Sequence, residues 1–156
     1  MPTVRVQYLP FDAGAEIAGM TTGRTDVGGI GCFIGTVRDT AASRPIRAMT
    51  LEHYPGMTER ALAQIADHAA ERWPLLACTL IHRIGRLLPG EPIVLVLTAS
   101  AHRQAALDAT AFLIDWLKTK APFWKNEEFA DGDTAWVAQD SRDNTAANRW
   151  QNNTQD

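Results

Sequence analysis

Cysteine and long apolar runs are scarce in this sequence. Its 156 residues include two cysteines, Cys32 and Cys78, and neither is paired with a second cysteine or a histidine in a metal-ligand motif. We expect both to be reduced, buried side chains of a cytoplasmic protein rather than parts of a disulfide or zinc site. The longest strongly apolar run, residues 93–97, is far shorter than the ~20 residues that span a bilayer. The N-terminus also lacks the pattern of a signal peptide, so we expect no membrane association.

An excess of positive charge is lacking as well. The chain has 15 Lys and Arg against 18 Asp and Glu, a net charge of −3. It therefore lacks the broad positive field that non-specific nucleic-acid binding needs, and any anion site must be local. The composition, 46% hydrophobic and 21% charged, is typical of a globular protein. The length predicts one domain over residues 1–143, followed by a loosely ordered polar tail over residues 144–156.

Apolar periodicity predicts alternating strands and helices. Period-two patterns and short apolar runs indicate strands at residues 4–8, 28–38, 46–54, 76–84, 92–99 and 136–137. Helical spacing indicates one helix over residues 58–73 and a second from an N-cap at Ser100 to Lys120. The strands at 28–38 and 46–54 are predicted to pair as a hairpin across a polar turn. Short turns favour an α+β fold, with a mainly antiparallel sheet packed against two principal helices.

Familiar catalytic motifs are missing. The glycines of residues 28–35 lack the spacing of a dinucleotide fingerprint, because Ile34 stands where the third glycine belongs and a strand is expected there. These glycines are better explained by close backbone approach within a strand. The sequence has no phosphate-binding loop, no zinc-ligand spacing of its histidines and no nucleophile elbow. We therefore expect neither a metal nor a cofactor.

Basic residues at element ends remain as candidates for a local anion site. They follow the glycine-rich strand, begin the second helix, or lie at its end and just beyond it: Arg38, His102, Arg103, Lys118, Lys120 and Lys125. A helix N-terminus favours anions, which fits a binding role. Lysines in a last helical turn also complement the helix dipole, and an arginine commonly ends an edge strand. Spacing alone therefore does not separate a site from a solvated surface.

Four segments carry a resemblance to a known family. They are LEHYPGM at residues 51–57, IHRIG at 81–85, SAHR at 100–103 and LKTKAPFWK at 117–125. In this order, over residues 28–136, the chain resembles the large, catalytic subunit of molybdopterin synthase. The resemblance implies a hammerhead-like α+β fold. It also implies sulfur transfer to cyclic pyranopterin monophosphate, forming the dithiolene of molybdopterin. The sulfur donor is the C-terminal thiocarboxylate of a small ubiquitin-like subunit.

The resemblance also implies roles for individual residues. Lys118 and Lys125 match the catalytic lysines, and Arg38, His102 and Arg103 match residues that bind the anionic substrate. A thiocarboxylate is already a good nucleophile, so the remaining tasks are to hold two anions together and to stabilise developing charge. We assign Lys118 to acid–base work or direct contact with the thiocarboxylate, and Lys125 to charge stabilisation. The sequence departs from the family just after this motif, where Asn126 replaces a basic residue and two glutamates follow.

The span of the second helix predicts a shared site. His102 and Lys118 lie at its two ends, roughly 24 Å apart at about 1.5 Å per residue. If both serve one reaction, the simplest arrangement is a homodimer with composite sites, within a heterotetramer that includes two small subunits. Two other functions stay open. One is a non-catalytic binding module for the tail of a ubiquitin-like carrier, and the other is a Schiff-base lyase built on Lys118.

Overall fold

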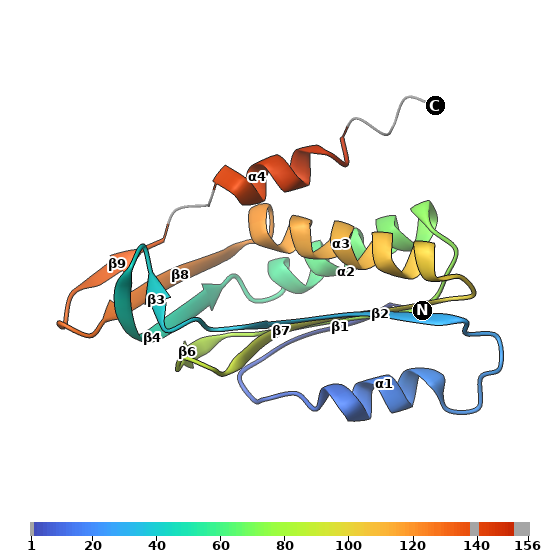
Figure 1. Cartoon of the computed structure of the whole chain (residues 1–156), viewed down its shortest axis with the longest axis horizontal. Coiled ribbons are helices and arrows are strands. Elements are labelled where there is room, and N and C mark those ends of the chain that lie inside the picture. The colour runs from blue at the N-terminus through green and yellow to red at the C-terminus, as the bar shows by residue number, and fades with distance from the viewer. Residues whose placement is uncertain (1, 138–140, 152–156) are drawn as a thin grey trace.

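The computed structural model describes residues 2–137 and 141–151 (Figure 1). Its strands are β1 (Pro2–Gln7), β2 (Gly29–Thr36), β3 (Thr40–Ala41), β4 (Arg44–His53), β5 (Leu75–Arg83), β6 (Gly85–Leu87), β7 (Pro92–Ser100), β8 (Phe123–Phe129) and β9 (Thr134–Trp136). Its helices are α1 (Ala13–Thr21), α2 (Met57–Arg72), α3 (Arg103–Thr119) and α4 (Ser141–Asn148). This mixture confirms the predicted α+β class.

The strands form two sheets. The first has the order β1-β5-β7-β2, in which only the β1–β5 pair is parallel. The second has the order β3-β4-β8-β9, with β6 also paired to β4, and is antiparallel throughout. Helices α2 and α3 cover one face of the first sheet, α1 lies on the other face, and α4 lies over α3 (Figure 1). The mainly antiparallel pairing agrees with the prediction from the sequence.

The core lies on both faces of the central strands. Val94 and Val96 of β7 pack with α2 and α3 on one face, whereas Leu95 and Leu97 pack towards α1 on the other. The sequence of a strand that is covered on both faces is a continuous apolar run rather than an alternation of apolar and polar residues. This double coverage explains the run at residues 93–97 that the sequence shows.

Gly31 confirms the close backbone approach expected of the glycine-rich strand. A Cβ atom at this position would overlap the Thr110 hydroxyl, the Ala106 carbonyl oxygen and the Thr98 hydroxyl. The Thr98 hydroxyl donates to the same Ala106 carbonyl oxygen over 2.7 Å, which ties β7 to α3. The missing side chain therefore lets α3 pack directly on β2 and β7, which fixes where the two ends of α3 lie.

The predicted hairpin between residues 28–38 and 46–54 is wrong. β2 pairs with β7, while β4 pairs with β3, β6 and β8 in the other sheet. The polar turn exists, but it closes only the short β3–β4 hairpin, in which Thr40 lies opposite Pro45. Ala42 and Ser43 turn the chain with positive φ angles. The segment between β2 and β3 thus carries the chain from one sheet to the other.

Two residue-level predictions also differ from the structure. Ser100 is the last residue of β7 and donates a hydrogen bond to the Pro74 carbonyl oxygen, so the N-cap of α3 is His102. Cys78 is buried as expected, but Cys32 is exposed. Cys32 lies on β2 next to Gly31, and neighbouring residues of a strand point to opposite faces. Because Gly31 faces α3, Cys32 points away from that helix.

Five of the described elements were missed in the sequence: α1, α4, β8 and the short strands β3 and β6. α1 is rich in alanine and glycine, and Asp12 caps it by accepting a hydrogen bond from the Ala15 amide. β8 was missed because residues 125–128 are all polar, so its sequence shows no alternation of apolar and polar residues. α4 and Trp150 replace the loosely ordered segment predicted from residue 144, whereas residues 152–156 of that tail lie outside the described residues. Within the described part of the chain, no helix is long and apolar enough to cross a membrane.

The C-terminal segment is held on α3 by one half-buried acid and a group of aromatic rings. The Asp115 carboxylate accepts hydrogen bonds from Arg149 (2.9 Å) and from the Trp150 indole (2.7 Å). The Trp150 ring packs edge-on against Trp73 and Phe112. These contacts fix the position of α4 relative to α3.

Candidate functional site

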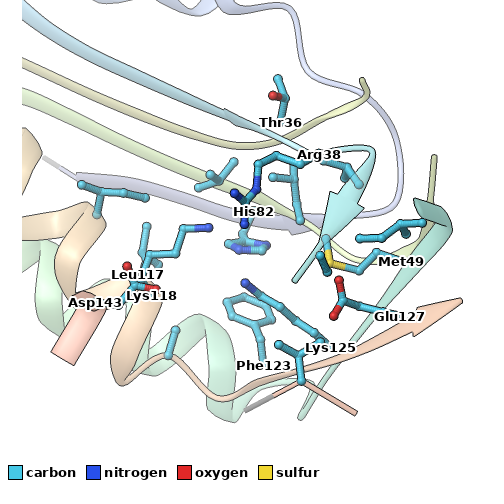
Figure 2. Close-up of a pocket in the computed structure, with 18 of the residues that line it drawn as sticks. Thr36, Arg38, Met49, His82, Leu117, Lys118, Phe123, Lys125, Glu127 and Asp143 are labelled. Atoms are coloured by element: carbon cyan, nitrogen blue, oxygen red, sulfur yellow. The ribbon is translucent and has the colours of Figure 1, made fainter. Parts of the chain in front are cut away.

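A pocket of about 380 Å³ lies where the two sheets meet the C-terminal end of α3. It is lined by the end of β2 and the residues that follow it, the last turns of α3, and alternate residues of β8. Residues of β3, β4 and β7 and single residues of β5 and α4 complete the lining. Figure 2 shows charged side chains pointing into this pocket from separate elements. They include Arg38, Lys118 and Lys125, so the structure brings together three of the five residues that the sequence singled out.

Lys118 reaches the pocket from the last turn of α3. Leu117 beside it is buried in the core, which anchors this turn against the sheet. α3 then ends, with Lys120 as its C-cap, before Pro122. The chain enters β8 at Phe123, so the segment APFWK is a helix end joined directly to a strand.

Lys125 reaches the pocket from β8. Alternate residues of a strand share a face, and Phe123, Lys125 and Glu127 all line the pocket. Trp124 points the other way, is 40% exposed and packs edge-on against Tyr54. The alternation of β8 therefore places two charged side chains in the pocket.

The surroundings of Lys125 in the pocket lower its pKa. Burial, and next the neighbouring Lys118 ammonium group, lower the pKa of Lys125 to about 8. Asp143 and Glu127 oppose this shift. Lys125 is therefore mostly protonated at neutral pH, but it can release or take up a proton near that pH.

Arg38 and Glu127 complete the charged lining. Arg38 follows β2 and lies on the side of the pocket opposite Phe123 (Figure 2). Burial raises the pKa of Glu127, although Lys125 and Arg38 favour its charged form. The pocket thus holds more positive than negative groups, which suits an anionic ligand.

His82 was not assigned to the site in the sequence analysis. It lies near the end of β5, lines the pocket and stacks on Phe123 with ring centroids 4.0 Å apart. Burial is the main cause that lowers the pKa of His82 to about 3. One sequence signal marks it, because a histidine here interrupts an otherwise apolar strand face.

His102 and Arg103 do not line this pocket. They lie at the other end of α3, where the backbone of Arg103 packs against Gly29 at the start of β2. The length of α3 separates them from Lys118 by about 24 Å, as expected from the helical rise. Within one copy of the chain, these two residues and the three in the pocket therefore form separate groups.

The chemistry of the pocket is that of anion binding and proton transfer. Among the described residues, no three His, Cys, Asp or Glu side chains are grouped to hold a metal ion. Lysine and arginine side chains can bind phosphate and carboxylate groups and stabilise negative charge that develops on oxygen. The volume falls in the range of pockets for small molecules.

Comparisons with known proteins give a consistent result. The MoaE protein family matches residues 6–120. The molybdopterin synthase catalytic subunit of Mesorhizobium japonicum is 51% identical over 155 residues, covering 99% of this chain and 96% of that protein. A solved structure of the molybdopterin biosynthesis MoaE protein from Burkholderia ambifaria is 46% identical, with a TM-score of 0.82, covering 97% of this chain and 99% of that chain.

A more distant structure shares the fold. It is a protein–protein complex of subunits 1 and 2 of the molybdopterin-converting factor from Helicobacter pylori. One of its chains superposes with a TM-score of 0.69 at 17% identity, covering 88% of this chain and 90% of that chain.

Proposed function

Because the chain belongs to the MoaE protein family, we propose that it is the catalytic subunit of a molybdopterin synthase and acts as a sulfurtransferase. Its substrates in this proposal are cyclic pyranopterin monophosphate and the C-terminal thiocarboxylate of a small ubiquitin-like subunit. One observation carries the proposal. Arg38, Lys118 and Lys125, which come from three separate segments, converge in a single pocket that also lowers the pKa of Lys125.

The pocket chemistry supports this reaction. Both substrates are anions, and fixed cations can hold them together in a partly dehydrated site. Lys118 is placed to contact the thiocarboxylate or to transfer a proton. Lys125, with its lowered pKa, is placed to stabilise negative charge and to exchange a proton near neutral pH. The planar guanidinium of Arg38 suits two-point binding of the phosphate.

A second copy of the chain would complete the site. β2 is one of the two edge strands of the first sheet, and its Ile30 and Ile34 side chains are 37% and 42% exposed. Antiparallel pairing of two β2 strands would set the start of one strand against the end of the other. Arg103 packs at the start of β2, and Arg38 follows its end. Such a homodimer would bring His102 and Arg103 of one copy towards the pocket of the other.

The partner that supplies sulfur is a small subunit with an extended C-terminal tail. The distant relative from Helicobacter pylori was solved as a complex of two subunits, which supports a two-component enzyme. A flexible, glycine-rich tail is suited to enter a pocket of this size and to present its terminal group to Lys118. Two copies of each chain would then form a heterotetramer.

The experiment that tests the function uses both substrates. The chain is incubated with the thiocarboxylated small subunit and cyclic pyranopterin monophosphate, and dithiolene formation is measured. We expect product, and we expect none with a small subunit that lacks its last two glycines, even if that subunit still binds. Binding of the complete carrier without product would identify a non-catalytic binding module instead.

A further inference from the structure

His82 is a polar side chain at what is otherwise a core position. Cys78 and Leu80 precede it on the same face of β5 and are buried in the cluster that includes α2 and α3. His82 is itself only 7% exposed. At this point the sheet face extends to the pocket, and Figure 2 shows the His82 ring among Arg38, Lys118, Phe123 and Lys125.

The contacts of the ring determine which nitrogen carries hydrogen. The Nδ1 atom lies 2.8 Å from the Arg83 carbonyl oxygen. A carbonyl oxygen can only accept a hydrogen bond, so Nδ1 carries the hydrogen. Burial keeps the ring neutral at physiological pH, since it lowers the pKa of His82 to about 3. Nε2 is therefore a bare acceptor, and stacking on Phe123 holds the plane of the ring in place.

Charged side chains from several elements surround the Nε2 atom of His82. Cations come from α3 (Lys118), from β8 (Lys125) and from the segment after β2 (Arg38). Carboxylates come from β8 (Glu127) and α4 (Asp143). The ring of His53 on β4 lies near Phe123 in a tilted arrangement, with ring centroids 6.5 Å apart. Of the charged neighbours that act on His82, Lys125 acts most strongly, followed by Lys118.

We propose that His82 is a positioning residue whose Nε2 accepts a hydrogen bond from the Lys125 ammonium group. Lys125 is the better donor candidate than Lys118 because it lies two residues from Phe123 on the same face of β8. A neutral acceptor holds an ammonium group without cancelling its charge, whereas a carboxylate would remove the positive charge that an anionic ligand needs. In the structure the one hydrogen bond of the His82 ring among the described residues is that to Arg83, so in this proposal the flexible Lys125 side chain turns to Nε2 in the free chain. The effect of this contact on turnover rests on the proposed function.

The test measures the pKa of Lys125 in the free chain by NMR titration of the lysine side chains, assigned with a Lys125→Met variant. His82→Phe keeps a ring that can stack on Phe123 but removes both nitrogens, while His82→Gln retains an acceptor. We expect His82→Phe to lower the pKa of Lys125 by roughly one unit, because the protonated form loses its acceptor. His82→Gln should recover part of this change. Thr79→Val, which removes another buried polar group of β5, should leave the pKa unchanged.

Two results would overturn the proposal. One is an unchanged pKa of Lys125 in a folded His82→Phe variant, and the other is an equal change in Thr79→Val. If His82→Phe does not fold, the wild-type chain still decides the question through the nitrogen NMR signals of His82. Nε2 must be the nitrogen without hydrogen at neutral pH, and its signal must move in the Lys125→Met variant; a hydrogen on Nε2, or a signal that stays in place, contradicts the contact.

Turnover separates this proposal from the proposed function. If the wild-type chain forms no dithiolene, the proposed function fails, but the NMR result stands by itself. If the wild type is active, His82→Phe should lower kcat more than it raises KM and should move the alkaline limb of the rate profile to lower pH. His82→Gln should lie between His82→Phe and the wild type. An active wild type with the same alkaline limb in His82→Phe would overturn the role of His82.

Discussion

Lys118 and Lys120 lie two positions apart at the end of α3, yet they face different surroundings. Lys118 lines the charged pocket, whereas Lys120 borders a separate hollow between α2, α3 and the C-terminal segment. Both lysines are near the helix C-terminus, where either contributes at most about 1 kcal/mol through the helix dipole. The two positions therefore form a matched pair that separates function from helix stability.

We expect Lys118→Ala to reduce dithiolene formation by roughly 100-fold or more, because a group that contacts the reacting atoms is lost. Lys120→Ala should stay within a few-fold of the wild type. The measurement is single-turnover product formation with the thiocarboxylated carrier, together with thermal unfolding of both variants. Similar rates for Lys118→Ala and Lys120→Ala would remove Lys118 from the catalytic site.

We expect the buried, charged Lys125 side chain to lower the stability of the folded chain. Its pKa is lower in the folded chain than in the unfolded chain, so burial of the charged form is unfavourable. Below about pH 8 both states are protonated and the full cost is present. As pH rises through the folded pKa, the unfolded state binds more protons and stability increases.

Lys125→Met should therefore stabilise the chain by roughly 2 kcal/mol at pH 7 while abolishing turnover. The gain over the wild type should shrink between about pH 8 and pH 10, as the wild-type lysine becomes neutral in the folded state. Urea unfolding at several pH values measures this difference. A loss of stability at pH 7, or a gain independent of pH, would contradict the burial of a charged lysine.

At the scale of single residues, the sequence predicted part of the lining of the candidate pocket. Arg38, Lys118 and Lys125 were found by resemblance, and the pocket contains all three. His82 was missed because its stacking contact is with Phe123, which lies about 40 residues away in the chain, on a strand that pairs with β4 in the other sheet. Contacts between the two sheets are not encoded in local spacing.

At the scale of elements, α4 packs on α3 and carries Asp143 to the pocket. Asp115 is the centre of this attachment, since Arg149 and the Trp150 indole both donate to it. Arg72 adds a hydrogen bond to the Trp150 carbonyl oxygen and lies over its ring. Loss of the Asp115 carboxylate would leave the indole N–H without its acceptor.

Asp115→Ala should therefore destabilise the chain by about 1–3 kcal/mol and make the C-terminal segment sensitive to trypsin at Arg149. Asp108→Ala is the matched control on the same helix, because Asp108 accepts hydrogen bonds only from the neighbouring Gln104 among its described contacts. The control should change stability by less than about 0.5 kcal/mol. Equal protease sensitivity of the two variants would show that Asp115 does not hold α4.

The elements that the sequence missed share a physical cause. α1 has weak periodicity because alanine and glycine fill most of it, and β8 has polar residues on both faces because one face borders the pocket. α2, α3, β5 and β7 were predicted because each buries a clear apolar face or run. The pairing of β2 with β7 was not predictable from turns, since Gly31 is selected by the packing of α3 rather than by a hairpin.

At the scale of the whole molecule, the distance between the two ends of α3 determines whether a shared site requires two copies of the chain, and this requirement can be tested. Arg103 and Lys118 can serve one site only if they come from different copies. Neither Arg103→Ala nor Lys118→Ala alone has an intact site in that arrangement. A mixed dimer has one, formed by Lys118 of one copy and Arg103 of the other.

After subunit exchange, an equal mixture of the two variants should recover roughly a quarter of wild-type activity, because half of the dimers are mixed and each has one intact site. An equal mixture of the wild type and a chain that carries both substitutions should also retain about a quarter of wild-type activity. The reason is that the mixed dimers of this pair have no intact site. Activity assays with exchange verified by mass labelling check both values. No recovery in the first mixture would place the site within one chain.

The strand order has a consequence for how the chain folds. β1 pairs with β5, β2 with β7, and β4 with β8, so the long strands of the N-terminal half find their partners far along the chain. During synthesis, these strands lack their main partners until residues beyond position 74 have left the ribosome, since among the described strand pairs only the short β3–β4 hairpin is complete before that point. Such non-local pairing slows folding relative to helical proteins of similar size. A fragment ending at residue 74 should therefore give the circular dichroism of an unfolded chain, whereas the full chain should fold in a late, cooperative step.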